Sequence, residues 1–127
     1  MNGKLVGYVC VGTNDLDTAK GFYDNLFSSL EISGFSPGPR GYFYQVEGGT
    51  SAFGIIKPEN GNEATVGNGS MAGLSMDSKE KVDELHAKAL EHGATDEGAP
   101  GARTETFYGA YFRDLDGNKI CAYSENI

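Results

Sequence analysis

The residue types that most often do chemistry in proteins are sparse in this chain of 127 residues. Its two histidines, His86 and His92, are six positions apart in a segment with helical periodicity. That spacing turns their side chains about 240° apart, so they cannot hold one metal ion together. His86 is expected to be a packed or surface imidazole. His92, near the end of the predicted helix, suits the negative end of the helix dipole as a cation.

Two carboxylates and two thiols complete the set of candidates. Asp114 and Asp116 have the spacing of an acid–base pair, but in the run Asp-Leu-Asp-Gly-Asn (114–118) they are expected to cap backbone amides. Cys121 could act as a nucleophile if its thiolate were favoured, yet no histidine or lysine is predictably beside it, so a buried, unreactive thiol is expected. Cys10 and Cys121 do not form a disulfide framework, which favours a reducing, cytoplasmic location. The sequence therefore predicts no catalytic residue.

A β-hairpin is predicted to position the last of these residues. Two β-rich runs, 108–113 and 119–123, flank the polar segment 114–118, whose glycine can take the positive φ of a tight turn. Alternation along the hairpin puts Tyr111, Cys121 and Tyr123 on one face, with Arg113 at its rim.

The first half of the chain predicts one helix and four strands. Residues 5–12 are expected to form a buried strand, and Asn14 with Asp17 resembles a helix-capping pair. Apolar residues then follow at helical spacing: Leu16, Ala19, Phe22, Tyr23, Leu26, Phe27 and Leu30. β-rich runs follow at 31–35, which ends at the Pro- and Gly-rich residues 36–39, then at 41–47 and 51–57, with a turn at Gly48-Gly49. Residues 58–69 are expected to form a loop.

The second half repeats this order. Residues 70–76 predict a strand, Asp77 with Glu80 repeats the capping pair, and the next helix is expected to stop at Gly93. A weak strand near 95–98 and a turn at Pro100-Gly101 lead into the hairpin. A shift of 63 positions superimposes both capping pairs and four apolar helix positions. The sequence therefore predicts an α+β fold built from β-α-β-β-β twice.

Composition narrows the classes of partner. The formal charge of −8, from 18 acidic and 10 basic residues, disfavours nucleic acid. No apolar run approaches about 20 residues, so neither a membrane span nor a signal peptide is expected.

The chain resembles the vicinal-oxygen-chelate superfamily, which contains glyoxalase I, bleomycin-resistance proteins and extradiol dioxygenases. The resemblance rests on residues 12–16 leading to Phe22-Tyr23, on 82–93, and most on 111–118, which is close to the family's Phe-x-Asp-Pro-Asp-Gly-Asn turn with Leu115 where proline is usual. Residues 57–69 and 96–101 look like those of small, single-domain members. The resemblance implies one domain over 1–127, with module one at about 1–60 and module two at about 68–127. It also implies a curved mixed-sheet cup and a homodimer.

In the family's enzymes a divalent metal is held in the cup by histidine or glutamate from the first, fourth, fifth and last strands. By resemblance these positions fall on Tyr8, Gly54, Met71 and Cys121. Tyr, Gly, Met and Cys do not make a metal site of the family type, because a phenol and a thioether are weak donors for Zn²⁺, Ni²⁺, Mn²⁺ or Fe²⁺ and glycine has no side chain. No metal or other cofactor is therefore expected. Cu(I) held through the sulfurs of Met71 and Cys121 is a minor alternative.

The leading hypothesis is a binding protein, similar to the bleomycin-resistance type, whose metal-free cup takes a small, flat organic molecule. Its expected ligand-binding residues are large and polarisable: Tyr8, Cys10, Met71, Tyr111, Arg113, Cys121 and Tyr123. One alternative is a metal-dependent lyase, isomerase or dioxygenase of the glyoxalase I type, in which Glu47, Glu59 or Glu105 would have to reach the cup. Another is an interaction protein whose interior is filled. The same scaffold supports all three, and the residues specify neither the ligand nor the inward face of 42–44.

Overall fold

The computed structural model describes residues 3–126 and contains two compact units, divided between Thr65 and Val66. We call them module 1 and module 2 and describe each by itself.

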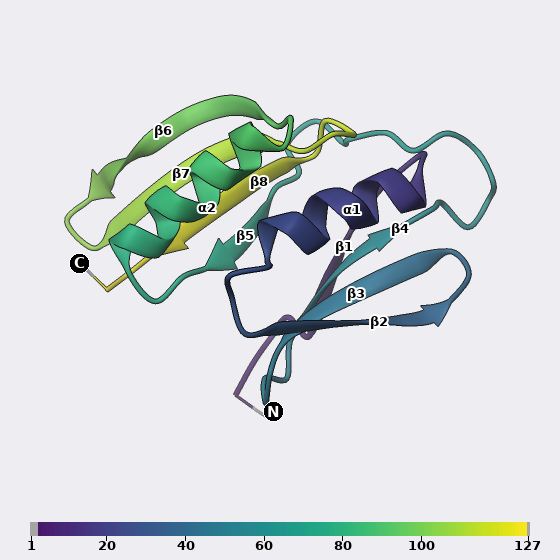
Figure 1. Cartoon of the computed structure of the whole chain (residues 1–127), viewed down its shortest axis with the longest axis horizontal. Helices are drawn as coiled ribbons and strands as arrows, with labels where there is room; N and C mark the ends of the chain where they lie inside the picture. The colour runs from purple at the N-terminus through teal and green to yellow at the C-terminus, as the bar shows by residue number, and fades with distance from the viewer. Residues whose placement is uncertain (1–2, 127) are drawn as a thin grey trace. The chain divides into compact units, whose positions relative to one another are not determined.

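Module 1 is a four-stranded mixed sheet with one helix (Figure 1). Its elements are β1 (Tyr8–Gly12), α1 (Leu16–Leu26), β2 (Ile32–Gly38), β3 (Gly41–Val46) and β4 (Ala52–Ile56). The strand order is β1-β4-β3-β2, in which β1 runs parallel to β4 and the other neighbours are antiparallel.

Module 2 has the same topology. Its elements are β5 (Ala72–Ser75), α2 (Lys79–Glu91), β6 (Thr95–Thr104), β7 (Phe107–Arg113) and β8 (Lys119–Ser124). The order β5-β8-β7-β6, with β5 parallel to β8, repeats that of module 1. The predicted α+β repeat of two β-α-β-β-β modules is confirmed. Over the residues described, neither helix is long and apolar enough to cross a membrane.

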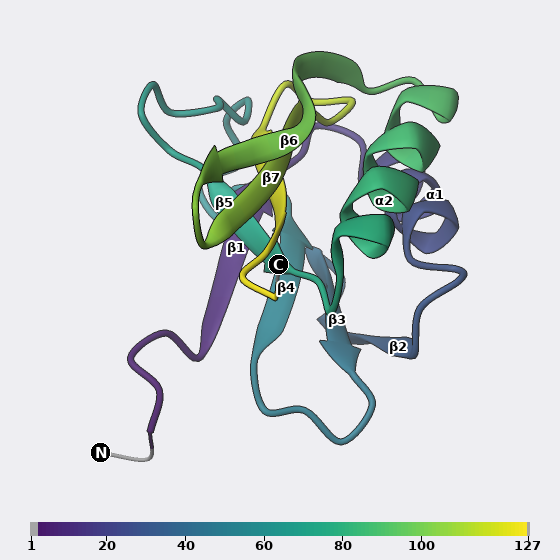
Figure 2. The ribbon, with the colours of Figure 1, turned by 90° about the vertical axis from the view of Figure 1, so that its left-hand side faces the viewer.

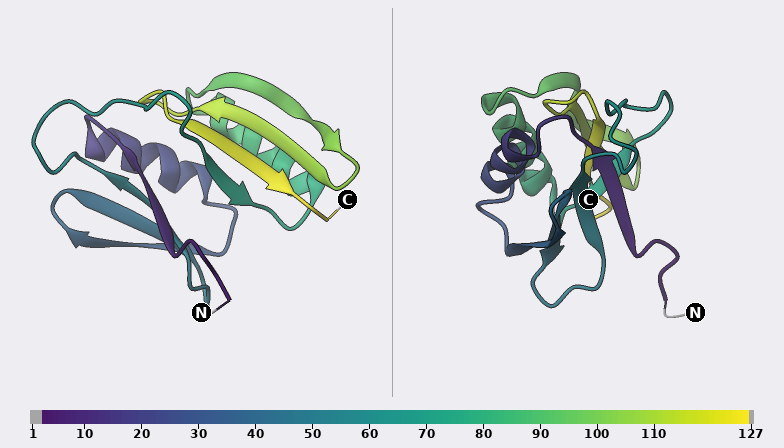
Figure 3. Two further views of the ribbon diagram at one scale, coloured as in Figure 1. Left: turned by 180° about the vertical axis from the view of Figure 1, so that it is seen from behind. Right: turned by 90° about the vertical axis from the view of Figure 1, so that its right-hand side faces the viewer.

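Each helix covers one face of its own sheet, because its apolar residues recur every three or four positions. In module 1, Ala19, Phe22, Tyr23 and Leu26 are buried, and the Tyr23 ring centroid lies 5.0 Å from that of Phe53 on β4. In module 2, α2 buries its own apolar face, and Figure 2 shows it on one side of β6 and β7. Seen from behind, β1 crosses in front of α1, and the strands of module 2 lie in front of α2 (Figure 3). The opposite face of each sheet therefore carries no helix.

Both predicted helix caps are wrong by one residue. Asp15, not Asn14, caps α1 by accepting a hydrogen bond from the Thr18 amide at 3.1 Å. The Asn14 side chain instead accepts from the Ala64 amide at 2.7 Å. Ser78 caps α2 in place of Asp77. The two caps are again 63 positions apart, so the repeat is preserved although its members shift.

Strand boundaries also differ from the prediction. β1 begins at Tyr8, because Leu5 is 87% exposed and has no partner strand to bury it. β2 continues through Pro37 to Gly38, and the turn predicted at Pro100-Gly101 is part of the ten-residue β6. Both strands lie at sheet edges and both shift register along their length, which is where proline is tolerated in a sheet.

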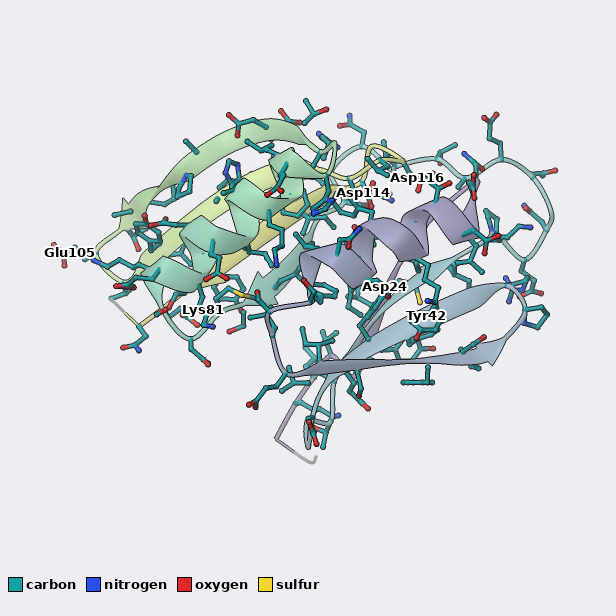
Figure 4. The ribbon with its side chains drawn as sticks, in the orientation of Figure 1. Asp24, Tyr42, Lys81, Glu105, Asp114 and Asp116 are labelled. Carbon is teal, nitrogen blue, oxygen red and sulfur yellow. The ribbon has the colours of Figure 1, made fainter. Side chains whose placement is uncertain are left out.

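The polar turn of the hairpin forms as predicted. The Asp114 carboxylate accepts from the amides of Asp116 at 3.0 Å and Asn118 at 2.9 Å, and Gly117 takes a φ of +90°. Figure 4 shows the labelled Asp114 and Asp116 in this turn, between β7 and β8. A carboxylate that holds two backbone amides is structural, which agrees with the capping role expected for Asp114.

The histidines are structural as well. His86 is buried on α2, and its Nε2 lies 3.0 Å from Oδ1 of Asp96 on β6. The Gly98 amide and then His86 lower the pKa of Asp96 below its ordinary value. His92 is the C-cap of α2 and is followed by Gly93 at a φ of +102°, as the predicted helix end required.

Candidate functional site

The candidate site residues lie on the faces that carry no helix, which we call the open faces. In module 1, Cys10 on β1 pairs with Gly54 on β4, which pairs with Phe43 on β3. In module 2, Gly73 on β5 pairs with Cys121 on β8, which pairs in turn with Tyr111 on β7. These positions alternate with the residues that pack against the helices, so they belong to the open faces.

The open face of module 1 is an aromatic surface. The Phe43 ring lies directly over Gly54, since a Cβ built on that glycine would stand 2.5 Å from Phe43 Cε2. The Tyr8 ring meets Phe43 edge-on with centroids 5.9 Å apart, and Phe35 stacks on Phe43 at 5.9 Å with 22° between planes. Tyr8 is 67% exposed and Phe35 is 47% exposed. Aromatic surface of this extent in solvent is available for contact.

Cys10 lies on the same face and is half-buried. Burial raises the pKa of its thiol, so the neutral form dominates near neutral pH. The thiol therefore contributes polarisable surface rather than a nucleophile.

The open face of module 2 combines aromatic and polar groups. The Tyr123 ring lies beside Gly73 and stacks on Phe107, with centroids 5.1 Å apart and 8° between planes. Cys121 is only 2% exposed and lies opposite Tyr111 in the pairing of β7 with β8. Burial raises the pKa of Cys121, although the Tyr111 hydroxyl and the charges of Arg103 and Lys119 oppose the rise. The thiol is held neutral at neutral pH, as the sequence predicted.

Two cations lie over the Tyr111 ring. The Arg103 guanidinium carbon is 5.3 Å and the Lys119 Nζ is 5.5 Å from the centroid of the Tyr111 ring, within the range of cation–π attraction. Arg113 instead pairs with Glu97 through its Nε at 2.5 Å and donates to the Gly117 carbonyl at 3.2 Å. The charge of Arg113 is thus offset within the module.

The predicted site residues fall into two groups. Tyr8 and Cys10 lie on the open face of module 1. Tyr111, Arg113, Cys121 and Tyr123 lie together on the open face of module 2, as the alternation along the hairpin predicted. Met71 immediately precedes β5 and is 52% exposed.

Sequence reasoning missed five residues of the open faces: Phe35, Phe43, Arg103, Phe107 and Lys119. Lys119 alternates with Cys121 and Tyr123, so the same pattern would have included it. The orientation of Phe43 was not predicted, because three consecutive aromatic residues do not reveal which of them points inward. In the structure Tyr42 and Tyr44 point to α1, where Tyr44 hydrogen-bonds Asp24 at 2.9 Å. Arg103 was not predicted as a site residue, because the sequence just before it was expected to form a turn rather than a strand.

The donor groups at the family's metal positions do not fit a divalent ion. Tyr8 offers a phenol, Met71 a thioether and Cys121 a buried thiol. Gly54 has no side chain, and the Phe43 ring takes the space where a ligand from β4 would project.

The carboxylates needed by the metal-dependent alternative lie outside the strands. Glu47 follows β3, Glu59 is in the loop after β4, and Glu105 is in the turn between β6 and β7. All three are exposed, and Figure 4 shows Glu105 at the end of its hairpin. Within residues 3–126, no three His, Cys, Asp or Glu side chains gather closely enough to hold a metal ion.

Two mixed sheets of identical topology, each with one helix, define an α+β protein of paired β-α-β-β-β modules. The family model described as the Glyoxalase/Bleomycin resistance protein/Dioxygenase superfamily matches residues 5–122. The chain belongs to this superfamily.

Solved structures agree. A glyoxalase/bleomycin resistance protein from Albidiferax ferrireducens T118 is 43% identical, with a TM-score of 0.84 over 95% of this chain and 98% of that one. A lactoylglutathione lyase from Agrobacterium tumefaciens is 21% identical, with a TM-score of 0.68 over 98% and 96%. A glyoxalase/bleomycin resistance protein/dioxygenase family enzyme from Burkholderia phytofirmans PsJN is 22% identical, with a TM-score of 0.71 over 93% and 96%. The last two show the shared fold alone. A search of curated proteins gave no match.

Proposed function

We propose that this protein binds small, flat organic molecules through aromatic contacts on the open face of each module, without a metal ion. The observation that carries the proposal is the Phe43 ring lying over Gly54. At the position where the family's enzymes need a metal ligand, this chain presents an aromatic surface.

The aromatic side chains support a ligand of matching shape. Rings prefer offset stacking or edge-to-face contact, and each such pair adds about 0.5–1.5 kcal/mol beyond its buried area. Burying one aromatic group contributes a further ~1.5–3 kcal/mol. A two-ring ligand in contact with two or three of these side chains would bind with about 4–8 kcal/mol, a Kd between about 1 mM and 1 μM.

The first test is metal binding. Protein purified without chelator is analysed for transition metals and then titrated calorimetrically with Zn²⁺, Ni²⁺, Mn²⁺ and, without oxygen, Fe²⁺. The proposal expects no stoichiometric metal and no tight binding. One equivalent of a bound metal would overturn it and favour the metal-dependent lyase, isomerase or dioxygenase.

The second test is binding of a neutral aromatic probe. Addition of 2-naphthamide to ¹⁵N-labelled protein should shift amide signals on the open faces, such as those of Phe43 and Tyr123, in a saturable way. Shifts confined to α1 and α2, or none at all, would reject an aromatic binding surface. They would favour an interaction protein instead.

The proposal also includes a cellular location and an oligomeric state. Both cysteines are free thiols, which supports a cytoplasmic location. The likeness to the family supports a homodimer, with twice the 13.5 kDa mass of one chain. Sedimentation equilibrium tests the dimer directly, since a single species of monomer mass would exclude it.

A further inference from the structure

We infer that the ligand is an organic anion, whose charged group lies beside Arg103 and Lys119 and whose ring lies against the aromatic side chains of module 2. The inference rests on the proposed function and adds to it the charge of the ligand.

The open face of module 2 differs in charge from the rest of the chain. The protein carries a formal charge of −8. Yet two cations, Arg103 and Lys119, lie over the Tyr111 ring, and a third cation of this module, Arg113, is paired with Glu97. A local positive potential within an acidic protein selects for a negatively charged molecule and against a cation.

Arg103 is held in place without a carboxylate partner. Its guanidinium donates to the carbonyls of Gly101 at 2.9 Å and Ala99 at 2.7 Å. Glycine at 98 and 101 makes room for it, because a Cβ at Gly101 would stand 2.9 Å from Arg103 Nη1. Among the described residues it forms no ion pair. An arginine fixed by carbonyls and an aromatic ring keeps its full charge and has further N–H donors for a carboxylate.

Lys119 provides the second charge. It is half-buried on β8, beside the Tyr111 ring, and like Arg103 it makes no ion pair with any described residue. Arg113 contrasts with both, because Glu97 neutralises it. Two cations over one aromatic ring, neither in an ion pair with a described residue, form an arrangement that an anion completes.

The surface for the ring of the ligand lies on the same face. Gly109 has no side chain, so the Phe107 ring crosses over it and stacks on Tyr123; a Cβ at Gly109 would stand 2.9 Å from Phe107 Cε1. Tyr111 and Tyr123 come from neighbouring strands of this face. An aromatic carboxylate would therefore contact both the cations and the aromatic rings, whereas a simple inorganic anion would contact only the cations.

The test compares three probes with one ring system and three charges: 2-naphthoate, 2-naphthamide and 2-naphthamidine. Binding to the full chain is measured by ¹⁵N amide shifts at low ionic strength. We expect the anion to bind about fivefold or more tightly than the neutral amide, and the cation to bind most weakly. Rising salt should weaken the naphthoate and leave the naphthamide nearly unchanged.

Variants locate the charge effect. Arg103→Gln and Lys119→Gln are each expected to weaken naphthoate binding by about threefold to fivefold, and the double variant by about tenfold, with a clearly smaller change in naphthamide binding. Lys79→Gln is the matched control. Lys79 also lies over a tyrosine of β7, with its Nζ 5.8 Å from the Tyr108 ring, but on the helix side of the sheet. It should leave all three affinities unchanged.

The outcomes separate the two proposals. Equal binding of naphthoate and naphthamide, or tighter binding of naphthamidine, would overturn the inferred charge while the aromatic surface stands. No binding by any of the three probes would reject the proposed function itself. If inorganic phosphate displaced naphthoate at an equal concentration, the aromatic ring of the ligand would not contribute to binding, and that part of the inference would be wrong. If Arg103→Gln does not fold, Lys119→Gln and the salt dependence decide the question.

Discussion

The two modules share one topology but differ at equivalent positions of their open faces. In each module one cysteine and one glycine stand opposite each other on the parallel strand pair, and their order is exchanged. Module 1 has Cys10 opposite Gly54, whereas module 2 has Gly73 opposite Cys121. The glycine decides where a ring can lie: Phe43 covers Gly54, and Tyr123 lies beside Gly73.

This difference shows how one fold provides two kinds of surface. Among strands β1–β4, the residues that alternate onto the open face of module 1 carry no charge, so the face is aromatic and neutral. In module 2 the equivalent of Gly54 is Cys121, which lies opposite Tyr111, and two cations lie over the Tyr111 ring. Topology sets which positions face outward, and the side chains at two or three of them set the chemistry.

The largest predicted effect is the difference in unfolding free energy between alanine variants of Gly54 and Gly73. Gly54→Ala forces a Cβ to within 2.5 Å of the Phe43 ring and should lower the free energy of unfolding by about 1–3 kcal/mol. Gly73→Ala meets Tyr123 at 3.3 Å and loses backbone freedom in the unfolded chain, so its change should be about 0.5 kcal/mol or less. Urea denaturation of both variants measures the difference.

The control removes the Phe43 ring. In a Phe43→Ala background, Gly54→Ala should have little effect, because the group that the new Cβ meets is gone. An equal penalty with and without Phe43 would mean that the ring does not lie over Gly54, and the observation that carries the proposed function would fail.

A smaller effect is expected at the tyrosines that tie each sheet to its helix. Tyr44 is buried and donates from its hydroxyl to Asp24 at 2.9 Å; burial and then this bond raise its pKa, so the phenol stays a donor. Tyr44→Phe should therefore lower the free energy of unfolding by about 1–2 kcal/mol. Tyr108 donates to Asp83 at 2.6 Å from an exposed position, and water can replace that partner. A loss in Tyr108→Phe that matched the loss in Tyr44→Phe would contradict the comparison.

The sequence predicted those parts of the fold whose cause is local. The turn 114–118 carries its own chemistry, since Asp114 holds two amides and Gly117 takes the positive φ, and both helices show their apolar period. The caps were missed because Asn14 and Asp15, like Asp77 and Ser78, are both good caps. In module 1 the choice is made by Ala64, fifty residues away, whose amide engages Asn14.

The open faces were predictable only along the hairpin, where alternation places Tyr111, Cys121 and Tyr123. Arg103 lies in a strand that is rich in glycine and contains a proline, and its register shifts three times. Such a strand does not show the regular two-residue alternation from which a face could be predicted. The ring over Gly54 depends on a cross-strand pair, β3 with β4, whose register is not visible in either strand alone.

The smallest effect concerns the helix caps, where module 1 uses a titrating residue and module 2 does not. The Asp15 carboxylate accepts hydrogen bonds from the backbone amide and the hydroxyl of Thr18. The hydrogen bond from the amide is the largest cause that lowers the pKa of Asp15 below its ordinary value of 3.8. A carboxyl group whose pKa is lower in the folded than in the unfolded protein stabilises the fold. This contribution is fully present above the pKa of the unfolded state, and it is lost as the pH falls through the pKa of the folded state.

Asp15→Ser gives module 1 the cap of module 2. Because Asp and Ser rank alike as N-caps, stability near neutral pH should hardly change, while the loss of stability between about pH 5 and pH 2 should become shallower. The reciprocal Ser78→Asp should steepen that loss, since it gives module 2 a cap that titrates. Thermal unfolding of both variants across the acid range measures the two slopes. If the slopes moved in the same direction, the Asp15 cap would not be the source of the acid dependence, and the modules would not differ in this respect.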